Sequence, residues 1–367
     1  MRVVVVAEYY PRVADPALGV WAHRQALAAQ AAGADVEVVV LHRPVPSKAA
    51  LQRRDLRELV APLRQPLRTI LDGIRVTYAP FVAPPRPRSY PRWGAYAAPS
   101  LALALKTLKP FDLVHAHYAA PAGDAVRRLN LGTPTVISVH GGDVLGVATR
   151  WRNGRAVVER SLRAARLVLA NSEGIADRCR ALGAQDVRVV HLGTDVPAHT
   201  TSGTDIVTVG NLIARKRHAD VIRALPPDTR YVIIGDGPER ANLERLAAGK
   251  DVVFRGALPP DEALTEARQA GVFVLPSTEE AFGVAYIEAM AAGLPAIGTR
   301  GEYGPEEIAR CGGGMTLTTP EALGATLRHV LEHRRELGAQ ARANVEANFT
   351  WALTGQRTVA AYEDALR

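Results

Sequence analysis

The chain has 367 residues, enough for two domains with sizeable buried cores. Hydrophobic residues make up 47% of it, charged residues 22%, and the formal net charge is +8. With two cysteines and no apolar run of membrane-spanning length, a disulfide scaffold and a transmembrane protein are excluded. The start, MRVVVVAEYY, lacks the long apolar region of a signal peptide, so we expect a cytoplasmic protein.

Strands and helices are predicted to alternate through the first half of the chain. Helices are expected at 21–32 and 172–182. The predicted strands are residues 3–7, 36–41, 74–78, 112–115, 135–139, 167–170 and 187–191. These runs are valine-rich and unbroken, as in parallel sheets that helices cover on both faces.

An arginine-rich segment, 53–92, interrupts this pattern. It holds nine arginines, no lysine and three acids, with leucines interleaved. Pro62 and Pro66 limit it to two short helices. Two interpretations stay open: a surface that meets anionic phospholipid or an anionic acceptor, and a merely solvated face. Nucleic acid is not expected, because aromatic residues are sparse and no nucleic-acid-binding motif is present.

The second half restarts the alternation after a polar segment, 197–205, that is predicted to be a linker. Its strands are expected at 206–209, 231–234, 252–254, 272–275 and 296–297, and 350–367 forms one more helix. The sequence therefore predicts an α/β protein with two Rossmann-like domains, 1–198 and 204–349, that face each other across a cleft.

Two carboxylates frame a predicted helix that begins at Gly283 and ends near Gly293. Glu280 precedes the helix, and Glu288 lies on or beside its apolar stripe, where a carboxylate needs a hydrogen-bonding partner. The loop before the helix follows a strand, and ligands of open α/β sheets bind at such strand ends. The free amides from about Gly283 to Tyr286 suit a phosphate. The alternative, two solvated acids, is equally compatible with this stretch alone.

Other polar motifs follow predicted strands and should gather at the same edges. Gly19 follows the first strand, although alone it is best read as a turn glycine. His117 ends DLVHAH, and His140 and Asp143 bound HGGD, which is either a site or a tight turn. GDGPE at 235–239 is a weak dinucleotide signal.

Three cations, Arg215, Lys216 and Arg217, precede a predicted helix in VGNLIARKR. Cations are unfavourable at a helix N-terminus, so their presence indicates an anion that they share with the helix end.

Taken together, these motifs resemble the family 4 retaining glycosyltransferases, which have the GT-B fold. The most specific element is EAFG-x4-EAMA-x-G-x-P at 280–295, which carries the E-x7-E pattern at Glu280 and Glu288. The supporting motifs span almost the whole chain: DLVHAH at 112–117, HGGD at 140–143, HLGTD at 191–195, VGNLIARK at 209–216, GDGPER at 235–240 and NFTW at 348–351.

The resemblance implies a nucleotide sugar on the second domain, an acceptor on the first, and a last helix, 350–367, that returns to the first domain. Glu280 matches the acid on the donor-sugar hydroxyls, and Glu288 the acid on the ribose. Lys216 matches the pyrophosphate lysine, His117 the histidine near the reacting centre, and Gly19 the loop glycine beside the phosphates. The catalytic set is thus His117, Lys216 and Glu280. The expected donor contacts are Gly19, Asn211, Arg215, Lys216, Glu280, Phe282, Gly283, Val284 and Glu288.

His140 and Asp143 are expected on the acceptor side. The chain departs from the family at Asn211, where arginine is usual. The adjacent cation Arg215 is expected to supply the missing charge from a different direction. Arg217 stands where glycine is usual.

The implied reaction is metal-independent hexosyl transfer with retention, from a UDP-, GDP-, ADP- or dTDP-sugar to a glycan, a glycolipid or another cell-envelope or metabolite acceptor. No cofactor and no metal site are expected. Peripheral contact with an anionic membrane at its inner face is one of the two open interpretations of the basic segment. The rival interpretations are a GT-B-like epimerase or phosphorylase and a non-catalytic sugar-nucleotide-binding subunit.

Overall fold

The computed structural model describes residues 1–46 and 56–367, and the chain forms two compact units. Unit 1 comprises Met1–Val190 and Ala352–Arg367, and unit 2 comprises His191–Trp351. Arg53, Arg54 and Asp55 of the predicted basic segment lie outside the described residues.

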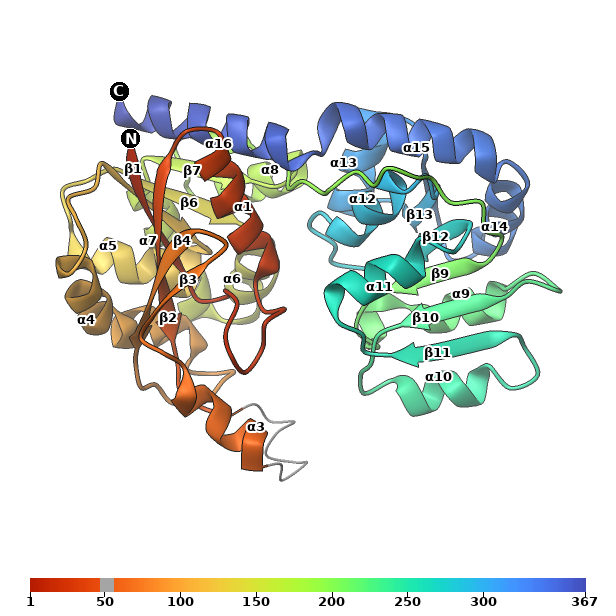
Figure 1. Ribbon diagram of the computed structural model, residues 1–367, viewed down its shortest axis with the longest axis horizontal. Coiled ribbons are helices and arrows are strands. Elements are labelled where there is room, and N and C mark those ends of the chain that lie inside the picture. Colours follow the sequence, from red (N-terminus) through yellow and green to blue (C-terminus); the bar gives the residue numbers. More distant parts are fainter. Residues whose placement is uncertain (47–55) are drawn as a thin grey trace. The chain divides into compact units, whose positions relative to one another are not determined.

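Unit 1 is built on an eight-stranded sheet in the order β3-β4-β2-β1-β5-β6-β7-β8 (Figure 1). All neighbouring strands are parallel except β3 and β4. The valine run of β1 is buried on both faces, which suits β-branched side chains at the centre of a sheet. The strands are β1 (Arg2–Ala7), β2 (Asp35–His42), β3 (Arg68–Leu71), β4 (Ile74–Pro80), β5 (Leu113–His117), β6 (Thr135–Val139), β7 (Leu167–Ala170) and β8 (Val187–Val189).

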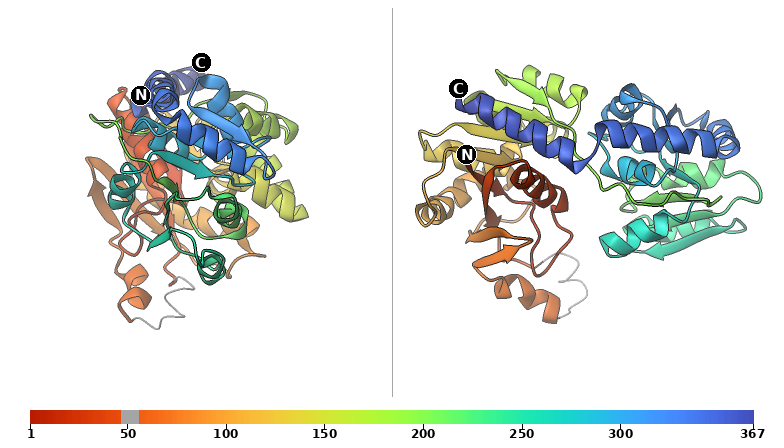
Figure 2. Two further views of the ribbon diagram at one scale, coloured as in Figure 1. Left: turned by 90° about the vertical axis from the view of Figure 1, so that its right-hand side faces the viewer. Right: turned by 45° about the horizontal axis from the view of Figure 1, so that its top comes forward.

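Helices flank this sheet, and the last one comes from the far end of the chain. Val359 and Tyr362 of α16 pack in the same core as β1 and α1, so α16 completes unit 1 (Figure 2). The helices of unit 1 are α1 (Val20–Ala31), α3 (Leu56–Val60), α4 (Trp93–Lys106), α5 (Asp124–Leu129), α6 (Ala148–Arg150), α7 (Arg152–Ala164), α8 (Glu173–Ala181) and α16 (Trp351–Leu366).

Unit 2 is built on a six-stranded, fully parallel sheet in the order β11-β10-β9-β12-β13-β14. Its strands are β9 (Ile206–Val209), β10 (Tyr231–Ile234), β11 (Val252–Gly256), β12 (Val272–Leu275), β13 (Ala296–Thr299) and β14 (Met315–Thr318). Its helices are α9 (His218–Ala224), α10 (Arg240–Leu246), α11 (Pro260–Ala267), α12 (Val284–Ala291), α13 (Tyr303–Cys311), α14 (Leu323–Glu332) and α15 (Arg334–Asn348).

The predicted α/β class and two parallel-sheet domains are confirmed, and every predicted strand is present within a few residues of its expected bounds. Two short strands were not predicted, β3 and β14. The expectation of two short helices in the basic segment is wrong in its second half, because Arg68–Leu71 pairs with β4 as an antiparallel edge strand. Segment 197–205, predicted as a linker, bonds within unit 2, where the Thr201 amide donates to Ala292 O (2.9 Å).

Neither Cys179 nor Cys311 forms a disulfide bond. Within the described part of the chain, no helix combines the length and the apolarity needed to cross a bilayer.

Candidate active site

The sheet of unit 2 reverses its direction of winding between β9 and β12. These strands are neighbours, but β10 lies on the far side of β9 and β13 on the far side of β12. The loops that leave their carboxyl ends therefore diverge and open a crevice, which is where ligands bind in open α/β sheets. The loop after β9 carries residues 210–217, and the loop after β12 carries residues 276–283.

Lys216 and Glu280 meet at this point although they are 64 positions apart. Lys216 Nζ donates to Glu280 Oε2 at 2.6 Å, and Arg215 Nη1 lies 3.9 Å from the same oxygen. The two loops are also joined through their backbones, since the Thr278 amide donates to Arg215 O (2.8 Å). The predicted convergence of the cationic loop with the acidic loop is therefore confirmed.

Arg217 does not join this cluster. Its guanidinium forms an ion pair with Asp220, three residues further on in α9, at 2.6 Å. Its backbone is left-handed (φ 56°), which turns the chain into α9. The prediction of three cations around one anion is thus reduced to two, Arg215 and Lys216, because the third is neutralised by its own helix.

Glu280 is held in place by its neighbours. Its side chain also accepts from Ser277 Oγ (2.9 Å), and its amide donates to Glu302 Oε2 (2.9 Å). Only 12% of the Glu280 side chain is exposed. The carboxylate is therefore fixed beside the Lys216 ammonium, where removal of either charge would leave the other poorly compensated.

Gly283 precedes α12 with a left-handed backbone (φ 82°). A Cβ at this position would lie 2.5 Å from the Tyr286 ring, so both conformation and space require glycine. The Tyr286 amide donates to Gly283 O (3.0 Å), which removes it from the predicted phosphate-binding set. The amides of the first residues of the helix remain, because an α-helix supplies them with no internal acceptor.

The remaining predicted donor residues of unit 2 differ in exposure. Glu288 and Val284 on α12 are half-buried, and Asn211 is exposed. Phe282 is 1% exposed and its ring stacks on His191, so its side chain belongs to the core. The structure thus brings Arg215, Lys216, Glu280 and Gly283 together, with Glu288 on the helix behind them.

The GDGPE segment has a packing explanation. A Cβ at Gly235 would lie 2.0 Å from Gly210 O, and one at Gly237 would lie 2.5 Å from Leu212 O. These glycines let the loop after β10 approach the loop after β9, so they need no dinucleotide.

The sheet of unit 1 has its own reversal point, between β1 and β5. Gly19 lies in the loop after β1, with φ 68°, and a Cβ there would lie 2.2 Å from the carbonyl carbon of Tyr9. The close approach of two backbone segments accounts for glycine at this position. His117 is the last residue of β5, as its predicted strand-end position requires.

Three imidazoles form a chain at the end of β5 and β6. His115 and His117 are two residues apart and therefore lie on the same face of β5, with ring centroids 4.5 Å apart. His117 Nδ1 lies 3.0 Å from His140 Nε2, and the rings stack. His115 bonds Tyr362 OH of α16 and Ser138 Oγ, each at 2.7 Å.

Burial keeps these imidazoles neutral. It lowers the pKa of His115 and of His140 to about 3, and that of His117 well below its ordinary value. His117 Nε2 and His140 Nδ1 are enclosed and have no hydrogen-bonding partner among the described residues. A buried ring nitrogen without a partner is costly, so both atoms are suited to a polar ligand group.

Asp143 lies beside this chain and is 1% exposed. It accepts from the Ala119 amide (3.0 Å) and the Val144 amide (3.2 Å). Burial raises the pKa of Asp143 to about 6 against the opposing effect of these amides. Its first role is therefore to organise the turns after β5 and β6.

Asp143 also lines a cavity of about 290 Å³ within unit 1. The other lining residues are Tyr9, Arg86, Pro87, Tyr90, Tyr118, Ala120, Gly142, Gly146, Val147, Arg150 and Trp151. Aromatic rings and arginines thus dominate its wall.

One charge pair at this cavity, between the buried Glu8 and the partly exposed Arg86, was missed from the sequence. The Arg86 guanidinium donates to Glu8, to which Tyr90 OH also donates at 2.7 Å, and it lies over the Tyr90 ring (4.0 Å to the centroid). The only signal was an acid directly after the first strand, and its partner lies 78 positions away.

Comparisons with known proteins agree with this geometry. Residues 195–347 match the family described as "Glycosyl transferases group 1", and residues 18–197 match "Glycosyltransferase Family 4". The chain belongs to the family 4 glycosyltransferases. It is a nucleotide-sugar glycosyltransferase of this retaining, GT-B family, as the motifs predicted.

Relatives of this family 4 glycosyltransferase include TuaC of Bacillus subtilis, named as a glycosyltransferase of teichuronic acid biosynthesis. It is 27% identical over 82% of this chain and 81% of its own length. A GDP-mannose-dependent phosphatidylinositol dimannoside mannosyltransferase of Mycobacterium tuberculosis is 32% identical over 46% of this chain and 50% of its own.

Solved structures share the fold. Sucrose-phosphate synthase of Thermosynechococcus elongatus superposes with a TM-score of 0.80 at 18% identity, covering 99% of both chains. Anabaena HepE in complex with UDP gives 0.73 at 19% identity, over 99% of this chain and all of that one.

Proposed function

We propose that this family 4 glycosyltransferase holds the diphosphate of its donor at the carboxyl ends of β9 and β12. The observation that carries the proposal is the Lys216–Glu280 contact of 2.6 Å beside the N-terminus of α12. Without donor, the Glu280 carboxylate neutralises the Lys216 ammonium. The more highly charged diphosphate then takes over that ammonium, together with Arg215 and the first amides of α12.

This exchange gives each charged residue a task. Once Lys216 turns to the diphosphate, Glu280 is released to accept hydrogen bonds from donor-sugar hydroxyls. Glu288, half-buried on α12, takes the ribose hydroxyls. As the glycosidic bond breaks, negative charge grows on the leaving diphosphate, and Lys216, Arg215 and the helix amides stabilise it.

We expect transfer with retention and without a catalytic metal ion. The acceptor hydroxyl attacks on the face that the diphosphate leaves, and a phosphate oxygen takes its proton. The His117–His140 pair is neutral, so it contributes hydrogen bonds through its unpartnered ring nitrogens and contributes no charge. Excess chelator should leave kcat within about twofold, because cations of the protein already serve the leaving group; a strong loss restored only by a divalent ion would contradict this.

Donor binding tests the diphosphate site directly. Thermal-shift measurements with UDP-, GDP-, ADP- and dTDP-sugars identify the donor, and UDP- and GDP-sugars come first because relatives and structural neighbours are named with them. Lys216→Met should weaken binding of the nucleoside diphosphate by ~10-fold or more while changing nucleoside binding little. Arg217→Met is the matched control, because Arg217 already forms an ion pair with Asp220. Equal effects of the two substitutions on diphosphate binding would contradict the proposal.

The acceptor is proposed to be an anionic glycan of the cell envelope, bound at the unit 1 cavity. Tyr9, Tyr118 and Trp151 offer aromatic faces to sugar rings, and Arg150 adds positive charge. The teichuronic acid role named for the Bacillus relative supports this acceptor class. Arg150→Gln should raise the KM of the acceptor several-fold and leave that of the donor unchanged. A change in donor KM alone would count against it.

The described part of the basic segment is proposed to contact anionic membrane from the cytoplasmic side. Between residues 56 and 70, four large apolar side chains are more than 60% exposed: Leu56, Leu63, Leu67 and Ile70. Arg57, Arg64 and Arg68 are interleaved with them and exposed. Apolar and cationic side chains together favour anionic lipid over a purely solvated face.

Vesicle sedimentation tests this contact. Binding to vesicles rich in anionic phospholipid should fall with salt, and Arg64→Gln with Arg68→Gln should weaken it by ~10-fold or more, since each cation contributes about 1 kcal/mol. Vesicles of neutral phospholipid are the control. If the protein does not bind anionic vesicles at low salt, the membrane contact is contradicted and the segment is a solvated face.

A further inference from the structure

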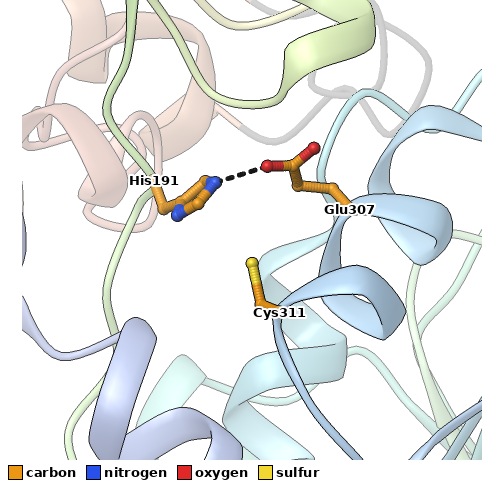
Figure 3. Close-up of side chains that lie close together, drawn as sticks. All are labelled: His191, Glu307 and Cys311. Atoms are coloured by element: carbon orange, nitrogen blue, oxygen red, sulfur yellow. Dashed lines mark hydrogen bonds and ion pairs between the residues drawn. The ribbon is translucent and has the colours of Figure 1, made fainter.

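A second cluster in unit 2 lies outside the donor site, and it combines three kinds of metal-binding side chain. Glu307 and Cys311 are four residues apart on α13, so the helix presents the carboxylate and the thiol on one face. His191, the first residue of unit 2, supplies an imidazole opposite them (Figure 3). One ligand atom of each residue lies within 4.8 Å of the other two.

The cluster is enclosed and its members are oriented. The His191 and Glu307 side chains are 11% and 4% exposed. The imidazole stacks on Phe282 and meets the edge of Phe349, with ring centroids 5.8 Å and 5.2 Å away. These aromatic contacts limit rotation of the ring and keep its Nε2 directed at the carboxylate, as Figure 3 shows.

Glu307 divides its two oxygens between two partners. Oε1 lies 2.7 Å from His191 Nε2, while Oε2 accepts from Arg310 at 2.6 Å. Arg310 therefore orients the carboxylate from outside the cluster and leaves Oε1 on the side of His191 and Cys311. Hydrogen bonds of this kind to a ligating group fix its orientation in metal sites.

We propose that His191, Glu307 and Cys311 bind a zinc ion. Imidazole, carboxylate and thiolate are the ligands that Zn²⁺ takes, with bonds of about 2.0–2.3 Å. In such a site, bonds to the metal ion replace the hydrogen bond between His191 and Glu307. The thiol of Cys311 loses its proton to solvent. Three protein ligands leave a fourth position for water.

Such an ion would act on unit 2 and not on the transferred sugar. The cluster shares no residue with Lys216, Arg215, Glu280 or Glu288. Bound zinc would join the segment that enters unit 2 to α13, whose N-terminal turn contacts the donor loop through the Gly304 amide and Glu280 O (3.0 Å). The expected consequence is stabilisation of unit 2.

Cobalt substitution tests the site in the full chain, prepared without a histidine tag. Co²⁺ added to reduced protein should give a thiolate-to-cobalt charge-transfer band together with the intense visible bands of tetrahedral cobalt, and Zn²⁺ should abolish both. Cys311→Ser should remove the thiolate band and weaken cobalt binding by more than about 100-fold.

The chain supplies its own control, because its only other cysteine, Cys179, lies buried in unit 1. Cys179→Ala should keep the band. The proposal is overturned if wild-type protein gives no thiolate band, or if the band survives Cys311→Ser.

Thermal unfolding gives a second readout. Zn²⁺ should raise the Tm of wild-type and Cys179→Ala protein but not that of Cys311→Ser or Glu307→Gln. An equal rise in Tm in all four proteins would mean that zinc binds elsewhere and would overturn the assignment.

Discussion

The two reversal points of this protein occupy the same place in two similar sheets, yet they are built from opposite chemistry. In unit 2 the residues that meet are charged: Lys216, Arg215 and Glu280 compensate one another at the mouth of the crevice. In unit 1 they are neutral: His117 and His140 stack on each other, and burial lowers the pKa of both. A cluster of paired charges can exchange one partner for an anionic ligand, whereas a neutral enclosed pair can only offer hydrogen bonds.

Removal of the exchangeable charge should have the largest effect. Lys216→Met should lower kcat by about 10²–10³, because a preorganised group that stabilises developing charge contributes ~3–4 kcal/mol. Arg217→Met, one residue along the chain, should change kcat less than about threefold. Initial-rate measurements with the identified donor decide this. Comparable losses would mean that net charge of the loop matters, and not the contact with Glu280.

The glycines at the two reversal points, Gly19 and Gly283, should differ in how much an alanine substitution destabilises the protein. Gly19→Ala should destabilise the protein by about 2–3 kcal/mol, because its Cβ would overlap backbone atoms of Tyr9 in addition to the cost of positive φ. Gly33→Ala, with φ 103° and nothing within 4 Å, should cost only about 1 kcal/mol.

Gly283→Ala should lie between these values, because its Cβ would meet the side chain of Tyr286 and not backbone atoms. Denaturant unfolding of the three variants gives the order. A cost for Gly19→Ala no greater than that for Gly33→Ala would remove close approach as the reason for glycine.

Acid should weaken unit 1 more than unit 2. In unit 1 burial lowers the native pKa of His115 and His140 to about 3 and that of His117 well below its ordinary value, whereas unfolded histidine titrates near 6.5. As pH falls below about 6.5 the unfolded state takes up protons that the native state refuses, so stability present above that pH is lost, by up to ~1.4 kcal/mol per pH unit for each ring.

Hydrogen exchange of the two units between pH 7 and 5 measures this difference. In unit 2 the pKa of His218 is lowered by burial to about 4, which gives a smaller acid effect. If acid lowers the protection of amides from exchange equally in both units, the expected difference in acid sensitivity is contradicted.

Asp143 should oppose this loss, and its effect should be the smallest. Its native pKa of about 6 lies above that of an unfolded aspartate, so the native state takes up a proton first as pH falls from about 6 to 4. Asp143→Asn removes that gain, and the stability of unit 1 should then fall more steeply with acid. Unfolding curves of the two proteins at matched pH test this. Identical slopes would mean that Asp143 titrates normally.

The unit 2 cluster was predictable from sequence because each residue lies in the loop that follows a strand at the centre of its sheet. Strand ends of neighbouring parallel strands meet, so Lys216 and Glu280 could be placed together without coordinates. The diversion of Arg217 to Asp220 was also readable, as an (i, i+3) pair of opposite charge.

Other features depend on contacts that no local pattern encodes. Glu8 and Arg86 are far apart in the chain, and the route between them passes through loops and an edge strand. β3 reads RTIL and β14 reads MTLT, so both lack the continuous apolar run that marks most of the other strands, and Ile70 on β3 is exposed. The geometry of Gly19 and Gly283 was likewise invisible, because a glycine in sequence does not reveal which backbone or ring it must clear.

The position of α16 has a consequence for how the protein is made. Tyr362 lies in the core of unit 1 and bonds His115, but the ribosome reaches it only after all of unit 2 has been synthesised. Unit 2 is continuous in sequence and can fold while the nascent chain is still growing. Unit 1 has to wait with an open face until translation is almost finished, so the part of the enzyme that emerges first is completed last.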